Sequence, residues 1–472
     1  MPHTAYERLR RAQRHSPNPT ADERTDWLER LERLLVTHKQ AFVSAIDADF
    51  GGRSSHETLL ADVLLTLDTV RSAKRSVESW MESTPVRPSK YFLPSRAMIE
   101  TMPKGVVGII SSWNYPVNLA FAPLAAALAA GNRVLLKPSE LTPRTSELIA
   151  RTVRETFTAE EVVVLEGDAE VAKQLCALPL DHLFFTGSTA VGKMVAAAAA
   201  VNLTPVTLEL GGKSPALVHA DYPIAKAAAR IAVGKMFNAG QTCIAPDYVL
   251  IADGRESEFV SAFRAAAKAA YPRLDGGQYS SVVSDRHLAR LEGLLADAQS
   301  QGARVEPVFP DEKVQGRRMP PVLVLGATSE MKLMQEEIFG PILPIRTHKN
   351  LDGAIDEING RPRPLSFYYF DEDLDRATGV LSRTISGGAC LNDTLVHFAQ
   401  EDLPFGGVGA SGMGAYHGRA GYDVFSHTRG VLIASAMSPA RQLQSPPYGR
   451  VLDTALEVLI GGAGFLRSKL LR

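Results

Sequence analysis

One cysteine in a glycine-containing segment could act as a nucleophile. Cys243 stands in Lys235-Met-Phe-Asn-Ala-Gly-Gln-Thr-Cys-Ile-Ala-Pro246, behind Gly240 and ahead of Pro246. Glycine allows a turn that a Cβ atom would block, and proline ends a helix that starts nearby. The segment therefore predicts a loop or a helix start, where backbone N–H groups lower the pKa of the thiol. A small buried hydrophobic side chain is the ordinary alternative for a free cysteine.

A carboxylate further upstream favours the catalytic interpretation. Glu209 lies in the apolar, strand-like run Thr207-Leu-Glu-Leu-Gly-Gly-Lys-Ser-Pro215, which stops at a glycine pair. A carboxylate at such a strand end can face a cleft and act as a general base. The alternative is a strand-end carboxylate that pairs with Lys213.

Composition narrows the class of protein. The chain has 472 residues, 45% of them apolar and 22% charged, with a formal net charge of −1. This length indicates two to four domains at roughly 100–200 residues each, and the charge gives no reason to expect nucleic acid. Cys176, Cys243 and Cys390 are odd in number and scattered, so we expect neither a disulfide framework nor a metal site. We see no secretory signal and no apolar run of 18 residues, and we expect a cytoplasmic protein.

The elements that must position Cys243 and Glu209 follow an alternating pattern. Residues 20–80 read as helices, with a capping box at Thr20 and one helix from His56 to Ser79. From Gly105 onward, buried strands at 106–110, 133–140, 162–165 and 182–185 alternate with helices. A second alternating region spans 216–392. The predicted fold class is α/β, with doubly wound parallel sheets whose ligands bind at the carboxyl ends of the strands.

A glycine-rich loop follows the strand at 182–185. Thr186-Gly-Ser-Thr-Ala-Val-Gly-Lys193 enters an alanine-rich helix and could hold a phosphate at the helix amino terminus. It lacks the middle glycine of the dinucleotide fingerprint, and its spacing is not that of a P-loop. A tight strand–helix turn is an equally open interpretation.

Seven short motifs follow one another along the chain: Trp113-Asn-Tyr-Pro116, Lys137-Pro-Ser-Glu140, Phe185-Thr-Gly-Ser188, Leu208-Glu-Leu-Gly-Gly212, Gly240-Gln-Thr-Cys243, Glu336-Glu-Ile-Phe-Gly-Pro341 and Pro404-Phe-Gly-Gly407. In types and order they resemble an aldehyde dehydrogenase of the NAD(P)-dependent superfamily, over about residues 20–435. The Gly388–Asp393 segment and the Pro446–Gly449 tail resemble the class 3 branch, nearest to bacterial coniferyl aldehyde dehydrogenases.

The resemblance implies two Rossmann-like domains and a small bridging β element for oligomerisation. The NAD(P)-binding domain would cover residues 1–88 and 103–208, and the catalytic domain residues 209–412. The bridging segment would consist of residues 89–102 and 413–437, followed by a tail at 438–472.

It also implies the roles of the catalytic residues. Cys243 attacks the aldehyde carbonyl, giving a thiohemiacetal and then, after hydride transfer to the nicotinamide, a thioester. The Asn114 side-chain amide and the Cys243 backbone N–H stabilise the oxyanion. Glu209 activates the water that hydrolyses the thioester, and its pKa should be raised by desolvation.

Cofactor roles carry over to eight residues: Lys137, Glu140, Gly187, Ser188, Leu210, Gly211, Glu337 and Phe339. By resemblance, Lys137 and Glu140 reach the adenine ribose, and Ser188 meets the pyrophosphate. A solvated surface pair is the ordinary alternative for Lys137 and Glu140. Because Glu140 would repel a 2′-phosphate, NAD is the preferred cofactor, with NADP left open.

By resemblance, the substrate funnel is formed by Trp113, Tyr115, Thr242 and Phe398. Aromatic walls suit an aryl aldehyde such as coniferyl aldehyde, or a medium- or long-chain aliphatic one. An ordinary apolar core would show the same residue types. Three other functions stay open: a CoA-acylating or other semialdehyde dehydrogenase, a thiol hydrolase without a dinucleotide, and a non-catalytic protein on this fold.

Assembly and the tail complete the expectations. The extended segment 89–102 and the residues after Gly430 resemble bridging strands, and we expect a homodimer. The tail shows a helical stripe, formed by Leu452, Leu456, Leu459, Ala463, Leu466 and Leu470. We expect it to dock on protein, because few basic residues flank it for an anionic membrane surface.

Overall fold

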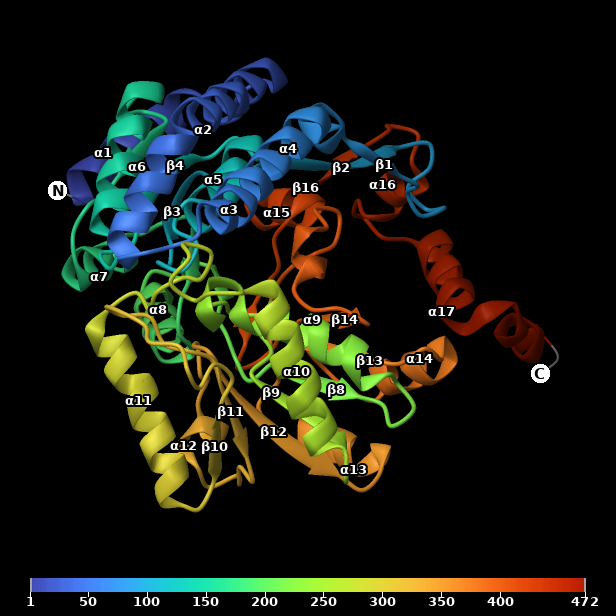
Figure 1. Ribbon diagram of the computed structural model, residues 1–472. Coiled ribbons are helices and arrows are strands. Elements are labelled where there is room, and N and C mark those ends of the chain that lie inside the picture. The colour runs from blue at the N-terminus through green and yellow to red at the C-terminus, as the bar shows by residue number, and fades with distance from the viewer. Residues whose placement is uncertain (1, 471–472) are drawn as a thin grey trace. The chain divides into compact units, whose positions relative to one another are not determined.

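The structure, a computed structural model, describes residues 2–470 and divides into two compact units (Figure 1). The larger unit comprises Met1–Glu78 and Pro103–Ser426. The smaller unit comprises Ser79–Met102 and His427–Arg472. Every residue with a predicted catalytic, cofactor or funnel role belongs to the larger unit.

The first sheet of the larger unit has six strands. In spatial order they are β15 (Gly412–Met413), β7 (Val206–Glu209), β6 (His182–Thr186), β3 (Val106–Ile110), β4 (Arg133–Lys137) and β5 (Val162–Val164). Only β15 runs antiparallel to its neighbour. Strands β3 and β4 are buried along their whole length, as the continuous apolar runs predict for a parallel sheet covered on both faces.

Helices cover this sheet. One apolar cluster joins the sheet to α1 (Pro2–His15), α7 (Ala169–Cys176) and α8 (Thr189–Ala200). Outside this cluster, α5 (Asn118–Ala129) packs on β3 and β4, and α6 (Pro143–Thr156) packs on β5. Helix α2 (Ala21–Phe50) packs in turn on α5 and α6.

The second sheet has seven strands. In spatial order they are β10 (Arg304–Pro307), β11 (Val322–Leu325), β12 (Ile342–His348), β9 (Tyr248–Ala252), β8 (Pro215–Val218), β13 (Ser366–Phe370) and β14 (Gly388–Leu391). Only β10 is antiparallel to its neighbour.

Two separate apolar clusters line the two faces of this sheet. Tyr368 joins the cluster that contains α9 (Ile224–Met236) and α10 (Glu256–Ala270). Its neighbours Phe367 and Tyr369 point the other way, into the cluster with α11 (Asp285–Ser300), α13 (Leu351–Asn359) and α14 (Leu374–Ser382). Side chains alternate across a strand, so helices lie on both faces. The predicted α/β fold class with doubly wound parallel sheets is confirmed.

The remaining elements of the larger unit are short: α12 (Lys332–Gln335), the 3₁₀ turns η2 (Phe237–Gly240) and η3 (Val396–Ala399), and α15 (Gly418–Val424). The capping box at Thr20 is present at the start of α2, where Thr20 and Glu23 exchange hydrogen bonds. The single helix predicted from His56 is interrupted. It consists of α3 (Ser55–Glu57), the π-helical turn η1 (Thr58–Leu64) and α4 (Leu65–Met81).

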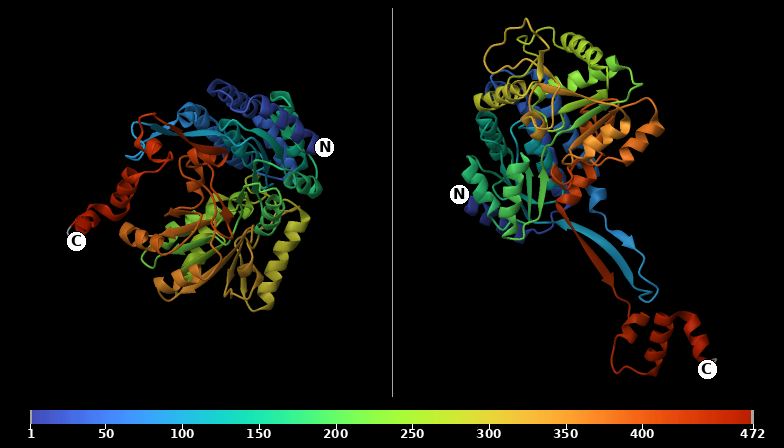
Figure 2. Two further views of the ribbon diagram at one scale, coloured as in Figure 1. Left: turned by 180° about the vertical axis from the view of Figure 1, so that it is seen from behind. Right: turned by 90° about the horizontal axis from the view of Figure 1, so that it is seen from below.

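The smaller unit contains a three-stranded sheet in the order β1 (Thr84–Val86), β2 (Arg96–Pro103) and β16 (Ser426–Ile433). Figure 2 shows β2 and β16 side by side, followed by α16 (Pro439–Leu443) and α17 (Arg450–Leu470). Helix α16 is tied to the turn before β2, because the Ala440 N–H and the Ser438 hydroxyl both donate to the Tyr91 carbonyl.

The tail is helical over the predicted stripe, although the stripe side chains beyond Ile460 lie outside the described residues. Where the tail docks stays a prediction. No helix among the described residues combines the length and the apolar character needed to cross a membrane.

The predicted domain boundaries remain a prediction. The first sheet takes its strands from residues 106–209 and 412–413, and the second from 215–391. The chain therefore passes from one sheet to the other directly after Glu209.

The three-stranded sheet leads to a prediction about assembly. Strand β16 ends the strand order, and Leu432 and Ile433 on it are 49% and 44% exposed. An exposed edge strand with apolar side chains invites pairing with another chain. We predict a homodimer by light scattering at micromolar concentration, and a monomer mass there would contradict the prediction.

Candidate active site

The segment that carries Cys243 begins with an unusual turn. After α9, three successive residues adopt positive φ angles: Asn238 (50°), Ala239 (51°) and Gly240 (73°). A Cβ atom at Gly240 would overlap the backbone carbonyl of Gly340, so only glycine fits there. The prediction that the thiol lies on a loop or at a helix start is confirmed, because Cys243 lies in a turn shortly after η2.

The thiol is half-buried, and its pKa is raised. Burial is the main cause, followed by the nearby Glu337 and Glu209 carboxylates, whose charges disfavour a thiolate. The backbone N–H groups of Cys243 and Ile244 act in the predicted direction and favour the thiolate, but they are outweighed. The predicted lowering of the pKa is therefore wrong, and the thiol needs a base.

Glu209 ends β7 and is 3% exposed. Neither carboxylate oxygen has a hydrogen-bond partner in the structure, and burial raises the pKa of the group well above its usual value. The alternative pairing with Lys213 is wrong, because the Lys213 ammonium binds Asp247 and the Leu333 carbonyl. A desolvated carboxylate beside a thiol matches the predicted general base.

Asn114 connects the end of β3 to the cysteine loop. Its side-chain amide donates to the backbone carbonyl of Gln241 at 3.2 Å. The Gln241 side chain in turn donates to the Asn238 and Ser281 carbonyls, both at 3.0 Å. This places the predicted oxyanion donor against the segment that carries Cys243.

Glu337 lies against Gly211, where a Cβ atom would overlap its carboxylate. Burial and the nearby Asp247 raise the pKa of Glu337 to about 8. Asp247 also holds the local backbone, since it accepts from the Ile338 N–H at 2.9 Å and binds Lys213. The motifs at 208–212 and 336–341, which by resemblance contact the cofactor, are thus brought together near the Cys243 thiol.

Phe339 has a φ angle of 50°, and its ring meets Trp113 edge to face at 5.3 Å between centroids. Trp113 also meets His287 at 5.1 Å. Trp113 therefore lies beside a residue predicted to contact the nicotinamide.

The carboxyl edge of the six-stranded sheet carries the other predicted cofactor residues. Lys137 is buried and binds the exposed Glu140 at 2.5 Å, so the alternative of a wholly solvated pair does not hold for Lys137. Gly187 donates its N–H to the Glu209 carbonyl, and Ser188 caps α8.

Polar atoms without partners also gather at this edge. Ser111 directly follows β3, and Thr186 is the last residue of β6. The hydroxyls of both residues are buried without a hydrogen-bond partner. Leu210, at the same edge, packs on Gly192 of α8. A helix start, a buried lysine and two orphaned hydroxyls at the carboxyl ends of parallel strands fit a dinucleotide.

Apart from Trp113, which packs on Phe339, the predicted funnel residues fall into two groups. The Tyr115 hydroxyl and the Thr242 hydroxyl are 2.6 Å apart, and Thr242 directly precedes Cys243 in the chain. Phe398 instead packs edge to face on Phe405 and on His417, each at 4.8 Å between centroids.

Sequence reasoning missed His417, a buried residue whose Nδ1 atom has no hydrogen-bond partner. It also missed Arg53, Glu57 and Asp62, which are buried around Asn114 and the cysteine loop. A charged side chain in a helical stretch gives no sequence signal that it is buried.

Comparison with known proteins decides the family. The sequence matches the profile of the "Aldehyde dehydrogenase family" over residues 3–431. The chain belongs to the aldehyde dehydrogenase family. It is 47% identical to the "Probable coniferyl aldehyde dehydrogenase" of Pseudomonas aeruginosa, covering 95% of this chain and 94% of the relative. It is 43% identical to the "Coniferyl aldehyde dehydrogenase" of a Pseudomonas species, covering 97% and 96%.

Solved structures agree. A substrate-bound aldehyde dehydrogenase of Staphylococcus aureus superposes with a TM-score of 0.92 at 36% identity, over 98% of this chain and 99% of that one. The "NAD-dependent aldehyde dehydrogenase from Sinorhizobium meliloti" gives a TM-score of 0.85 at 26% identity, over 95% and 88%. This aldehyde dehydrogenase is thus an oxidoreductase of aldehydes, and the hydrolase and non-catalytic alternatives are wrong.

Two glycines of the site give a matched prediction. Gly211→Ala displaces the Glu337 carboxylate, which is the end of a flexible side chain, and it should weaken NAD binding severalfold with little change in thermal midpoint. Gly240→Ala meets a backbone carbonyl at positive φ and should destabilise the protein by more than about 1 kcal/mol. Calorimetric titration with NAD and thermal unfolding separate the two effects. Equal losses of stability would contradict this account.

Proposed function

We propose that this aldehyde dehydrogenase oxidises an aryl aldehyde of the coniferyl type to its acid through a thioester on Cys243. Medium- or long-chain aliphatic aldehydes are the second substrate class. The observation that carries the proposal is the buried Glu209 carboxylate, without hydrogen-bond partners and close enough to the thiol to raise its pKa. A nucleophile and a base whose environments are both desolvated form a pair suited to acyl transfer.

The first step needs a proton acceptor, because the thiol is protonated at neutral pH. Burial raises the pKa of the Glu209 carboxyl group well above its usual value, which makes its carboxylate a stronger base toward the thiol proton. The thiolate then attacks the aldehyde carbon and forms a thiohemiacetal. The negative oxygen receives hydrogen bonds from the Asn114 amide and the Cys243 backbone N–H.

NAD(P), when bound, supplies the hydride acceptor for this oxidation. Lys137, Glu140 and Ser188 would hold its adenosine and pyrophosphate end, together with Gly187. Glu337 and Phe339 would hold its nicotinamide end, with Leu210 and Gly211 beside it. The exposed Glu140 carboxylate supports a preference for NAD, because it would repel the 2′-phosphate of NADP.

The acyl group must then leave the sulfur. Once Glu209 has released the thiol proton to solvent, its carboxylate takes a proton from water. The hydroxide attacks the thioester carbon, the C–S bond breaks to release the acid, and the leaving thiolate takes the proton back from Glu209. Transfer to CoA would not need a desolvated base at this position. Glu209 therefore supports hydrolysis and disfavours the CoA-acylating alternative.

Two lines of evidence support an aromatic substrate. Both Pseudomonas relatives carry coniferyl aldehyde in their names. Trp113, Tyr115 and Phe398, which the resemblance assigns to the substrate funnel, would supply aromatic surface to such a substrate.

Replacing the nucleophile tests the proposal. Cys243→Ala should abolish cofactor reduction with every aldehyde, including coniferyl aldehyde, whereas NAD affinity by calorimetry should stay within about threefold of wild type, because the thiol contributes no cofactor contact in this mechanism. Reduction is followed over a panel of aryl and aliphatic aldehydes with NAD and with NADP. Turnover near the wild-type rate in the alanine variant would contradict the proposed mechanism.

Replacing the base separates the two half-reactions. Glu209→Gln should leave a burst of reduced cofactor followed by slow turnover. In the wild type, deacylation should rise with pH through the raised pKa of Glu209, because only the carboxylate accepts a proton. In Glu209→Gln this rise should be absent. Rapid-mixing kinetics between pH 5 and 9 give both results, and acceleration by added CoA would instead favour the acylating alternative.

A further inference from the structure

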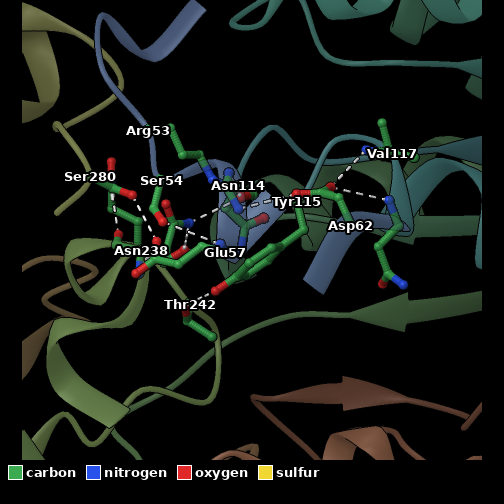
Figure 3. A network of polar contacts seen from close by, with 12 residues as sticks. Arg53, Ser54, Glu57, Asp62, Asn114, Tyr115, Val117, Asn238, Thr242 and Ser280 are labelled. Atoms are coloured by element: carbon green, nitrogen blue, oxygen red, sulfur yellow. Dashed lines mark hydrogen bonds and ion pairs between the residues drawn. The ribbon is translucent and has the colours of Figure 1, made fainter. Parts of the chain in front are cut away.

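Three buried charged residues stand next to the site and take no part in the mechanism above. Arg53, Glu57 and Asp62 are 4%, 5% and 0% exposed and lie where α2 gives way to α3 and η1. Figure 3 shows them around Asn114, Tyr115 and Asn238.

Arg53 binds the residue that carries the oxyanion donor. One of its nitrogens donates to the Asn114 backbone carbonyl at 2.7 Å, and another binds Asp62 at 3.1 Å. Its guanidinium also lies over the rings of Phe50 and Tyr115, at 4.8 and 4.9 Å. A planar guanidinium can make these contacts at once, which an ammonium cannot.

Asp62 fixes the chain just after Asn114. Its other oxygen accepts from the backbone N–H groups of Val117 and Asn118 at 3.0 and 3.3 Å. These N–H groups belong to the start of α5, where helices have unpaired donors and favour a carboxylate. The backbone of residues 114–118 is thus held at one end by Arg53 and at the other end by Asp62.

Glu57 holds the turn before the nucleophile. Its carboxylate accepts from the Asn238 N–H at 3.1 Å, the Ser280 hydroxyl at 2.8 Å and the Tyr271 hydroxyl at 3.3 Å. Asn238 is the first of the three residues with positive φ. Its side-chain amide donates to the Asn114 and Gln241 carbonyls at 3.0 and 3.1 Å, which closes the network.

The π-helical turn lets both carboxylates face this network. Glu57 and Asp62 are five residues apart, which would place them about 140° apart around an α-helix. A π-helical turn closes its hydrogen bond five residues along, so the two residues stand about one turn apart. Single π-helical turns are often found at functional sites.

We propose that Arg53, Glu57 and Asp62 are positioning residues that hold the Asn114 amide and the Cys243 loop in one mutual arrangement. The inference rests on the proposed thioester mechanism. A buried ion pair is weak evidence for stability, because apolar groups of similar volume are often as stabilising or more so. What the three residues add is geometry. Arg53 and Asp62 hold residues 114–118, and Glu57 holds Asn238, whose amide joins the cysteine loop to the Asn114 carbonyl.

The test compares two buried carboxylates. Glu57→Leu removes the acceptor of the Asn238 N–H, and Asp371→Leu removes a carboxylate that likewise accepts several hydrogen bonds, from Tyr369, Asp373 and Arg376. Glu57→Leu should lower kcat about 10- to 100-fold, the range expected for a hydrogen bond to a charged group, with the KM for NAD unchanged. Asp371→Leu should lower the thermal midpoint similarly and leave kcat within about twofold of wild type. Equal losses of kcat would overturn the proposal.

Coupling separates positioning from a general loss of structure. In the Asn114→Ala background, Glu57→Leu should lower kcat by a clearly smaller factor than in the wild type, because the Asn114 amide that Glu57 helps to position is already absent. Glu57→Gln, whose amide oxygen can still accept from Asn238, should recover most of the rate. Additive effects and no recovery by Gln would contradict positioning.

A thiol-labelling readout keeps this test apart from the proposed mechanism. Glu57→Leu should change the iodoacetamide alkylation rate of Cys243, with Cys243→Ala protein as the blank, whereas Asp371→Leu should not. This result does not depend on how aldehyde is oxidised, so failure of the thioester mechanism alone would leave it intact. If Glu57→Leu does not fold, the Ser280→Ala and Tyr271→Phe double variant removes two of the donors to Glu57. It must then show the same changes in labelling and coupling, and unchanged labelling would overturn the proposal.

Discussion

The left-handed turn from Asn238 to Gly240 is the constraint on which the site depends. A non-glycine residue at positive φ is disfavoured, and here two of them precede a glycine that no other residue could replace. Such a turn persists only when its surroundings over-determine it. Glu57 binds its first N–H, and the Gly340 carbonyl packs on its last residue. The position of Cys243 is thus set by contacts from distant parts of the chain.

Desolvation is the second constraint. The turn places the thiol where the carboxylates of Glu209 and Glu337 both raise its pKa. Burial penalises the charged form of all three groups, and the two carboxylate charges penalise the thiolate further. A thiol with a raised pKa thus lies near a carboxylate that has no hydrogen-bond partner, and this carboxylate is the group placed to accept the thiol proton. Acid–base exchange, more than a permanently charged thiolate, fits this environment.

Much of the fold was readable from the sequence because its signals are local. Continuous apolar runs such as Val106–Ile110 predicted buried parallel strands, and Thr20 with Glu23 predicted the start of α2. The motifs around Glu209, Cys243 and Glu337 located the site. Contacts between distant residues left no such signal. That Lys213 binds Asp247 and leaves Glu209 without a partner could not be read from the sequence, because Lys213 is nearer to Glu209 along the chain.

The direction of the Cys243 pKa shift shows why this limit matters for function. The residues next to Cys243 in the sequence point only to the backbone N–H groups of the loop, which do favour the thiolate. Glu337 lies far away in sequence, and only the fold brings its charge to the thiol. The π-helical turn at Thr58–Leu64 likewise has no local signal in the sequence. Nothing in a run of helix-forming residues requires it, but the turn allows Glu57 and Asp62 to reach two different parts of one site. Short sequence motifs supply the reacting residues, whereas tertiary contacts set the pKa values and the alignment of these residues.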